Sequence, residues 1–148
     1  MKSNQMLTFK LLDNEYAINI DYVTSIQEYK HITRVPGSPS FIKGVMNLRG
    51  AVTPIIDLKR RMNLGEFQAD SEPNIIVALL DDICIGLMVD EVKEVIEVPK
   101  DRIDQTIISD GEEGGFFEGL ARIEGRVIMA VNLQSLLLQN YAGSPPYV

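Results

Sequence analysis

The chain has 148 residues, of which 45% are hydrophobic and 24% are charged, and its formal net charge is −7. This length suits one domain or two very small ones, with a core large enough to fold without disulfides or metal ions. The single cysteine, Cys84, excludes an intramolecular disulfide and is expected to be a small core residue. The charge disfavours free nucleic acid and anionic lipid as partners, and because no apolar run of signal-peptide or membrane-spanning length is present, we expect a cytoplasmic protein without direct membrane insertion.

The first predicted element is a hairpin over residues 7–20. Apolar and polar residues alternate along it, and Asp13 lies in its turn. The period then changes, because Ile20, Val23 and Ile26 lie three residues apart. This spacing predicts a short helical turn after the hairpin.

A second hairpin is predicted over residues 44–58, whose sequence is GVMNLRGAVTPIIDL. Two strand-like runs flank Arg49-Gly50, which is typical of a turn. A short helix is expected to follow, capped by Asp57, because its carboxylate can accept hydrogen bonds from the free N–H groups of the first turn. Strand, turn, strand and capped helix therefore form one unit.

The polar segment 63–74 is the expected joint between two halves of the chain. After it, the apolar runs at 75–80 and 83–89 predict a buried hairpin, and a short helix is expected from Asp90 to Ile96. The acidic, glycine-rich segment 110–115 lacks the spacing of a phosphate-binding or calcium-binding loop and is expected to be a solvated loop.

The second hairpin unit occurs twice, at an offset of 75 residues. Gly44 matches Gly119, and the caps Asp57 and Asn132 also correspond. Arg49 is matched by Glu124, which reverses the charge at the turn. That difference indicates either a functional position or merely a solvated turn residue, and the sequence leaves both interpretations open.

The first hairpin and its helix also repeat, at an offset of 69 residues, with Val23 matching Val92 and Ile26 matching Val95. Upstream of the turn we expect an offset of 68, which places Asp13 on Asp81. Each half then contains hairpin, short helix, hairpin and short helix. The predicted fold is all-β with short helices, as two five-stranded barrels related by an internal repeat. The expected barrels span about 15–80 and 81–148 plus 1–14, and the helices carrying Val23 and Val92 are expected to meet along an apolar groove.

Catalysis has little support in the sequence. His31 is the single histidine, and neither a nucleophile elbow nor a zinc signature accompanies Cys84. We therefore predict no enzymatic activity, no catalytic residue, no metal site and no cofactor. Two alternatives stay open: an OB-like barrel that binds nucleic acid, and an enzyme that uses His31 or the acidic loop.

The segment FIKGVMNLRG at 41–50, followed by Pro54 and Asp57-Leu58, resembles the CheW family of bacterial chemotaxis adaptors. Shorter matches around 18–26, 34–36 and 86–92 follow in order, so the resemblance covers almost the whole chain. It implies two SH3-like five-stranded barrels around a hydrophobic groove. It also implies a scaffold that connects the cytoplasmic tip of chemoreceptors to the regulatory domain of the CheA histidine kinase, in membrane-associated receptor arrays.

Site residues follow from the same resemblance by position. It implies a receptor-binding set made of Ile20, Val23, Ile26, Arg49 and Val92. It implies kinase contact through Lys43 and Val52. A receptor helix presents apolar side chains at i, i+3 and i+4, which such a groove accepts, with Arg49 pairing an acidic residue at its rim. Whether Ile20 and Ile26 are exposed or wholly internal is left open.

Overall fold

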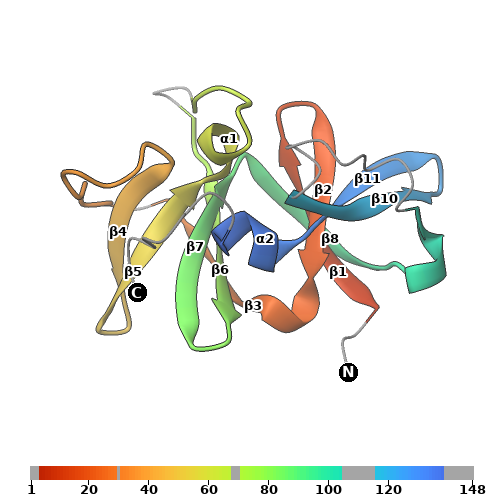
Figure 1. The fold of residues 1–148 in the computed structure, drawn as a ribbon, viewed down its shortest axis with the longest axis horizontal. Helices are drawn as coiled ribbons and strands as arrows, with labels where there is room; N and C mark the ends of the chain where they lie inside the picture. The colour runs from red at the N-terminus through yellow and green to blue at the C-terminus, as the bar shows by residue number, and fades with distance from the viewer. Residues whose placement is uncertain (1–3, 30, 68–70, 105–115, 139–148) are drawn as a thin grey trace. The chain divides into compact units, whose positions relative to one another are not determined.

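The structure is a computed structural model that describes residues 4–29, 31–67, 71–104 and 116–138. Within these ranges the chain is mostly β-strand, with two short α-helices and two short 3-10 helices (Figure 1). This architecture confirms the predicted fold class. The chain divides into two compact units: unit 1 is formed by Met1–Tyr22 and Val92–Asn140, and unit 2 is built on Val23–Glu91. The acidic segment 110–115 lies outside the described residues.

Unit 2 contains a five-stranded sheet in the order β3-β6-β7-β5-β4. Adjacent strands are antiparallel except β5 and β7, which are parallel. The strands are β3 (Val23–Glu28), β4 (Ile42–Leu48), β5 (Ala51–Asp57), β6 (Asn74–Leu80) and β7 (Ile83–Val89). Its buried core cluster comprises Met46, Ile55, Ile75, Val77 and Met88. Cys84 is partly buried and packs against this cluster.

Unit 1 contains a six-stranded sheet in the order β8-β1-β2-β11-β10-β9. The strands are β1 (Gln5–Leu11), β2 (Asn14–Asn19), β8 (Glu91–Glu97), β9 (Ile103–Asp104), β10 (Phe117–Ile123) and β11 (Arg126–Val131). Its buried core cluster comprises Met6, Ala17, Val98, Ala121, Ile128 and Ala130. The sixth strand, β9, is only two residues long. The other five, in the order β8-β1-β2-β11-β10, correspond strand for strand to the order β3-β6-β7-β5-β4 in unit 2.

In each half of the repeat, the first hairpin and the strand that follows it belong to different units. β3 directly follows the β1–β2 hairpin of unit 1, yet it pairs with β6 of unit 2. β8 follows the β6–β7 hairpin of unit 2, yet it lies beside β1 in unit 1. Because the two hairpins are equivalent, the exchange is reciprocal (Figure 1).

The repeat at offset 75 is visible in the backbone as well as in the sequence. The N–H of Asp57 donates to the carbonyl of Phe41 at 2.7 Å, and the N–H of Asn132 donates to that of Phe116 at the same distance. As predicted, Asp57 also caps α1 (Leu58–Arg61) by accepting the N–H of Arg60 at 3.1 Å. Asn132 accepts the N–H of Ser135 at 3.1 Å before α2 (Leu133–Leu138).

The repeated glycine is explained by a close backbone approach. Gly44 and Gly119 each lie at a register shift in the first strand of their hairpin. A Cβ on Gly44 would lie 2.3 Å from the carbonyl oxygen of Thr33, and one on Gly119 would lie 2.9 Å from that of Asp104. In both units a preceding segment crosses the hairpin at this point, so a side chain has no room there.

The predicted change of offset within the first hairpin is wrong. β1 and β6 correspond at an offset of 69 at both ends, and the matching turn residues are Leu12 and Asp81, with φ values of 58° and 55°. The expected slip to 68, which pairs Asp13 with Asp81, therefore does not occur. Both turns have two residues, but Asp13 is the second residue of its turn and Asp81 is the first residue of its own. The two aspartates therefore occupy different backbone positions.

The short helices predicted around 20–26 and 90–96 are also wrong. Only Ile20–Tyr22 forms a helical turn, the 3-10 element η1, and the chain then continues as β3. Residues 91–97 form β8. The three-residue spacing in β3 coincides with a register shift between Val23 and Ser25, where an extra residue changes the alternation of a strand. Val23 and Val92 are therefore on equivalent strands, not helices.

Candidate functional site

Strand β3 forms one end of the five-stranded sheet and carries two of the predicted receptor contacts. Within this sheet it pairs only with β6. Val23 is partly buried at its start, and Ile26 is 48% exposed near its middle. A large aliphatic side chain that is half open on a terminal strand supplies an apolar contact for a partner.

Strand β8 presents the equivalent positions in unit 1. Val92 is partly buried, like Val23, and Val95 is 47% exposed, close to the value for its counterpart Ile26. Ile20, the remaining apolar member of the predicted set, is partly buried in η1. The repeat therefore reproduces the exposure of these side chains as well as their place in the strand.

Arg49 lies at the tip of the β4–β5 hairpin with φ of 53°, followed by Gly50 with φ of 83°. This pair of left-handed residues forms the tight turn predicted from the sequence, and the N–H of Gly50 donates to the Asn47 side chain at 3.1 Å. The Arg49 residue is exposed, and no ion pair is found for it within the described residues. Its guanidinium is available for a carboxylate on a partner.

The predicted receptor set is therefore divided between the two units. β3 brings Val23 and Ile26 together, and Arg49 is at the turn that joins the last two strands in the order of the same sheet. Ile20 and Val92 belong to unit 1. The assignment of these five residues to one receptor site stays a prediction.

The two predicted kinase contacts are exposed and lie apart on the β4–β5 hairpin. Val52 is 69% exposed and pairs with Asn47 near the turn, whereas Lys43 is near the open end of β4. Lys43 and Asn47 are four positions apart, which corresponds to about 13 Å of strand. The parallel pairing of β5 with β7 covers only the end of β5, from Ile55 to Asp57. Val52 is thus an exposed apolar side chain near the turn, whereas Lys43 is an exposed cation.

A buried ion pair holds α1 against the end of β7. The Nζ of Lys59 is 2.7 Å from an Asp90 carboxylate oxygen, and its side chain is only 6% exposed. The same ammonium lies 4.2 Å from the centre of the Phe67 ring. Asp90 directly precedes β8, so this pair fixes the point from which the exchanged strand departs.

Burial also affects Asp57, the residue that caps the N-terminus of α1. It raises the pKa of the Asp57 carboxyl above its usual range, although the hydrogen bond from the Arg60 N–H and the nearby positive charges of Arg60 and Lys43 act in the opposite direction. Asp57 is a helix cap in these surroundings.

Residues 5–140 match the CheW-like domain family. The chain belongs to the CheW family. It is 36% identical over 134 residues to chemotaxis protein CheW of Rhizobium meliloti, which covers 89% of this chain and 86% of that protein. It is 44% identical over 100 residues to chemotaxis protein CheW of Bacillus subtilis, which covers 68% of this chain and 64% of that protein. The crystal structure of the scaffolding protein TtCheW from Thermoanaerobacter tengcongensis matches with a TM-score of 0.87 and 30% identity over 99% of both chains.

Membership in the CheW family establishes a scaffold or adaptor role in chemotaxis and confirms the function predicted from FIKGVMNLRG. Because CheW proteins are scaffolds, it also confirms that the chain is not an enzyme.

His31, the single histidine, is exposed. The described residues contain no group of three or more histidine, cysteine, aspartate or glutamate residues able to hold a metal ion. Within the same residues, no helix is both long and apolar enough to cross a membrane.

Sequence reasoning missed two candidate contacts of this CheW-family chain. Val95 matches Ile26 in the repeat and shares its exposure, so the repeat alone identifies it. Ile83 is 37% exposed at the start of β7. The apolar run 83–89 predicts a buried strand, so no local pattern indicates that its first residue is exposed.

Proposed function

We propose that the chain couples the cytoplasmic tip of chemoreceptors to the regulatory domain of the CheA histidine kinase. This role places it in the cytoplasm, recruited to membrane-associated receptor arrays. The observation that carries the proposal is Ile26, a half-exposed isoleucine on a terminal strand of a CheW-family chain. The expected barrel bounds, about 15–80 and 81–148 plus 1–14, stay a prediction, and the compact units divide instead after Tyr22 and after Glu91.

The receptor tip is a helical hairpin, and a helix binds another protein through apolar side chains repeated along one face. Ile26 and Val23 offer it a short apolar contact, with Ile20 and Val92 as the proposed contribution of unit 1. Arg49 is exposed and without an ion pair among the described residues, which supports a role in pairing a receptor carboxylate. Apolar contact then supplies affinity, and the charge helps select the partner.

Kinase contact is proposed for Val52 and Lys43. The exposure of Val52 near the tip of the β4–β5 hairpin supports an apolar contact there. Lys43 lies on the same hairpin about 13 Å away, a separation well within one interface of standard size. The two residues therefore suit different parts of one kinase-binding surface.

Reconstitution tests the proposal directly. The full chain is mixed with a receptor signalling fragment and CheA, and receptor-dependent CheA autophosphorylation is measured. Ile26→Asp is expected to reduce receptor binding at least tenfold while CheA binding stays within twofold. Val52→Asp is expected to reduce CheA binding at least tenfold while receptor binding stays within twofold.

Val127→Asp is the matched control for both variants. Val127 is the counterpart of Val52 at offset 75 and is 52% exposed on β11, so the same charge is introduced at a similar surface. It is expected to leave both bindings within twofold. If Ile26→Asp and Val52→Asp retain both partners, the proposed contact residues are wrong. If the unmodified chain adds nothing to CheA autophosphorylation in the presence of receptor, the coupling role itself is wrong.

A further inference from the structure

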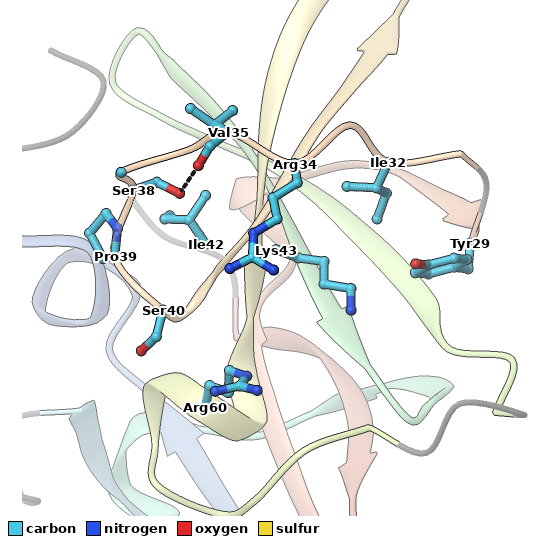
Figure 2. Close-up of a pocket in the computed structure, with 11 residues that line it drawn as sticks. Tyr29, Ile32, Arg34, Val35, Ser38, Pro39, Ser40, Ile42, Lys43 and Arg60 are labelled. Carbon is cyan, nitrogen blue, oxygen red and sulfur yellow. Dashed lines mark hydrogen bonds between the residues drawn. The ribbon is translucent and has the colours of Figure 1, made fainter.

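Unit 2 has a cavity of about 410 Å³ that the proposed partner contacts do not explain. It lies between the segment that connects β3 to β4 and the helix α1, and Figure 2 shows the residues around it. Its volume is within the range of small-molecule binding pockets. The residues that line it are Tyr29, Ile32, Arg34, Val35, Gly37, Ser38, Pro39, Ser40, Ile42, Lys43 and Arg60.

Backbone hydrogen bonds hold the connecting segment in place. Thr33 and Val45 exchange two of them, at 2.9 and 2.8 Å. The Ser38 hydroxyl donates to the Val35 carbonyl at 2.7 Å (Figure 2), and the N–H of Ile42 donates to that of Pro39 at 3.0 Å. The wall is therefore formed before any ligand arrives, which lowers the entropic cost of binding.

Three cationic side chains line the cavity, and no carboxylate does among the described residues. Arg60 is partly neutralised by Glu66 and, at 3.8 Å, by Asp57. Arg34 and Lys43 have no ion pair within the part of the chain that the structure describes. This positive cluster occurs in a chain whose net charge is −7, so it is a local feature and not a reflection of overall composition.

We propose that this cavity binds a small phosphate- or carboxylate-bearing molecule. Arg34 offers a planar set of N–H donors and Lys43 a mobile ammonium, a combination suited to the oxygens of either anion. Arg60 adds positive charge from the opposite side, and the Ser40 hydroxyl is a further donor. Ile32 and Pro39 supply apolar contact for the rest of the molecule. Lys43 is shared with the proposed kinase contact, whereas Arg34 and Arg60 belong to neither proposed interface.

The test is a titration of the isotopically labelled full chain, followed by amide chemical shifts. Sodium pyrophosphate and sodium citrate are the probes, and sodium chloride at matched ionic strength corrects for screening. We expect saturable shifts confined to residues 29–43 and the first turn of α1. Tighter binding of pyrophosphate assigns the site to phosphates, and tighter binding of citrate assigns it to carboxylates.

Arg34→Gln is expected to weaken binding of the better probe at least tenfold, and Lys43→Gln to have a similar effect. Arg122→Gln is the matched control, since it removes one positive charge from an exposed residue of β10 in unit 1. It should change the affinity by less than twofold. Equal weakening by Arg34→Gln and Arg122→Gln, or linear shifts without saturation for both probes, overturns the proposal. Binding of a polyglutamate peptide without saturable binding of either small anion also overturns it.

Discussion

Arg49 and Glu124 occupy the same position in two equivalent hairpin turns, with φ values of 53° and 50° and opposite charges. Each is followed by a glycine with φ near 80°. Because the backbone is the same, the side-chain charge is the main difference that a partner meets at these two turns. If the charge at this turn selects the receptor, only the turn of unit 2 should be sensitive to it.

We predict that Arg49→Glu weakens binding of the receptor fragment at least tenfold, because a carboxylate there repels the acidic residue it is proposed to meet. Glu124→Arg is the control, since it makes the opposite exchange on a matching backbone and should leave affinity within threefold at 150 mM salt. Affinities from titration calorimetry, with circular dichroism to confirm the fold, provide the measurement. Equal losses in the two variants would show that overall charge, not the Arg49 site, governs binding.

Arg126 connects three strands of unit 1, and this network predicts an acid-sensitive contribution to stability. Its guanidinium donates to the Glu15 carboxylate at 2.6 and 3.1 Å and to Glu94 on β8 at 2.7 Å. The hydrogen bond from Arg126 lowers the pKa of Glu15 below its ordinary value of 4.5. The charged form is therefore favoured in the folded state. This stabilisation is fully present above pH 4.5 and is lost as the pH falls through the lowered pKa.

Glu15→Gln is accordingly predicted to reduce the free energy of unfolding at pH 7 by about 2 kcal/mol, the scale of a partly buried hydrogen bond between charged groups. The difference from the unmodified chain should shrink progressively below pH 4.5. Urea unfolding at a series of pH values measures it. A difference that stays constant down to pH 3 would show that Glu15 contributes through packing and not through its charge.

How far the sequence predicts the fold depends on how local each feature is. The Arg49-Gly50 turn and the Asp57 cap are set by residues within a few positions of each other, and both are found as predicted. β3 and β8 were predicted as helices because their pairing partners, β6 and β1, lie about 50 and 85 residues away in the chain. Strand formation there depends on those distant partners.

The candidate site follows the same rule. Ile26 was identified by position, but whether it is exposed depends on the exchange of β3 into unit 2. The cavity beside Arg34 and Lys43 left no periodic or motif signal, since its lining combines an irregular segment with a residue of α1. Tertiary structure alone brings Arg60 to it.

The glycine at the start of each repeated hairpin provides a stability test. Gly44→Ala and Gly119→Ala are each predicted to lower the free energy of unfolding by about 2 to 4 kcal/mol, because the new Cβ would overlap a crossing backbone carbonyl. Gly50→Ala is the control, as its Cβ would meet no atom within 4 Å. It should cost only about 1 kcal/mol for the left-handed backbone. Urea midpoints at equal slope distinguish these cases, and equal costs for Gly44→Ala and Gly50→Ala would contradict the steric explanation.

The Lys59–Asp90 pair gives the last prediction, because removing each partner has a different consequence. Asp90→Asn leaves a buried ammonium without its carboxylate and is predicted to cost about 3 kcal/mol. Lys59→Met keeps an unbranched side chain of similar length and removes an ion-pair partner only from the more exposed Asp90 carboxylate, so it should cost about 1 kcal/mol. The double variant should then be more stable than Asp90→Asn alone. Equilibrium unfolding of the three variants, analysed as a double-mutant cycle, measures the coupling. If Asp90→Asn and the double variant unfold at the same urea concentration, the cost arises from Asp90 at the start of β8 and not from the stranded charge of Lys59.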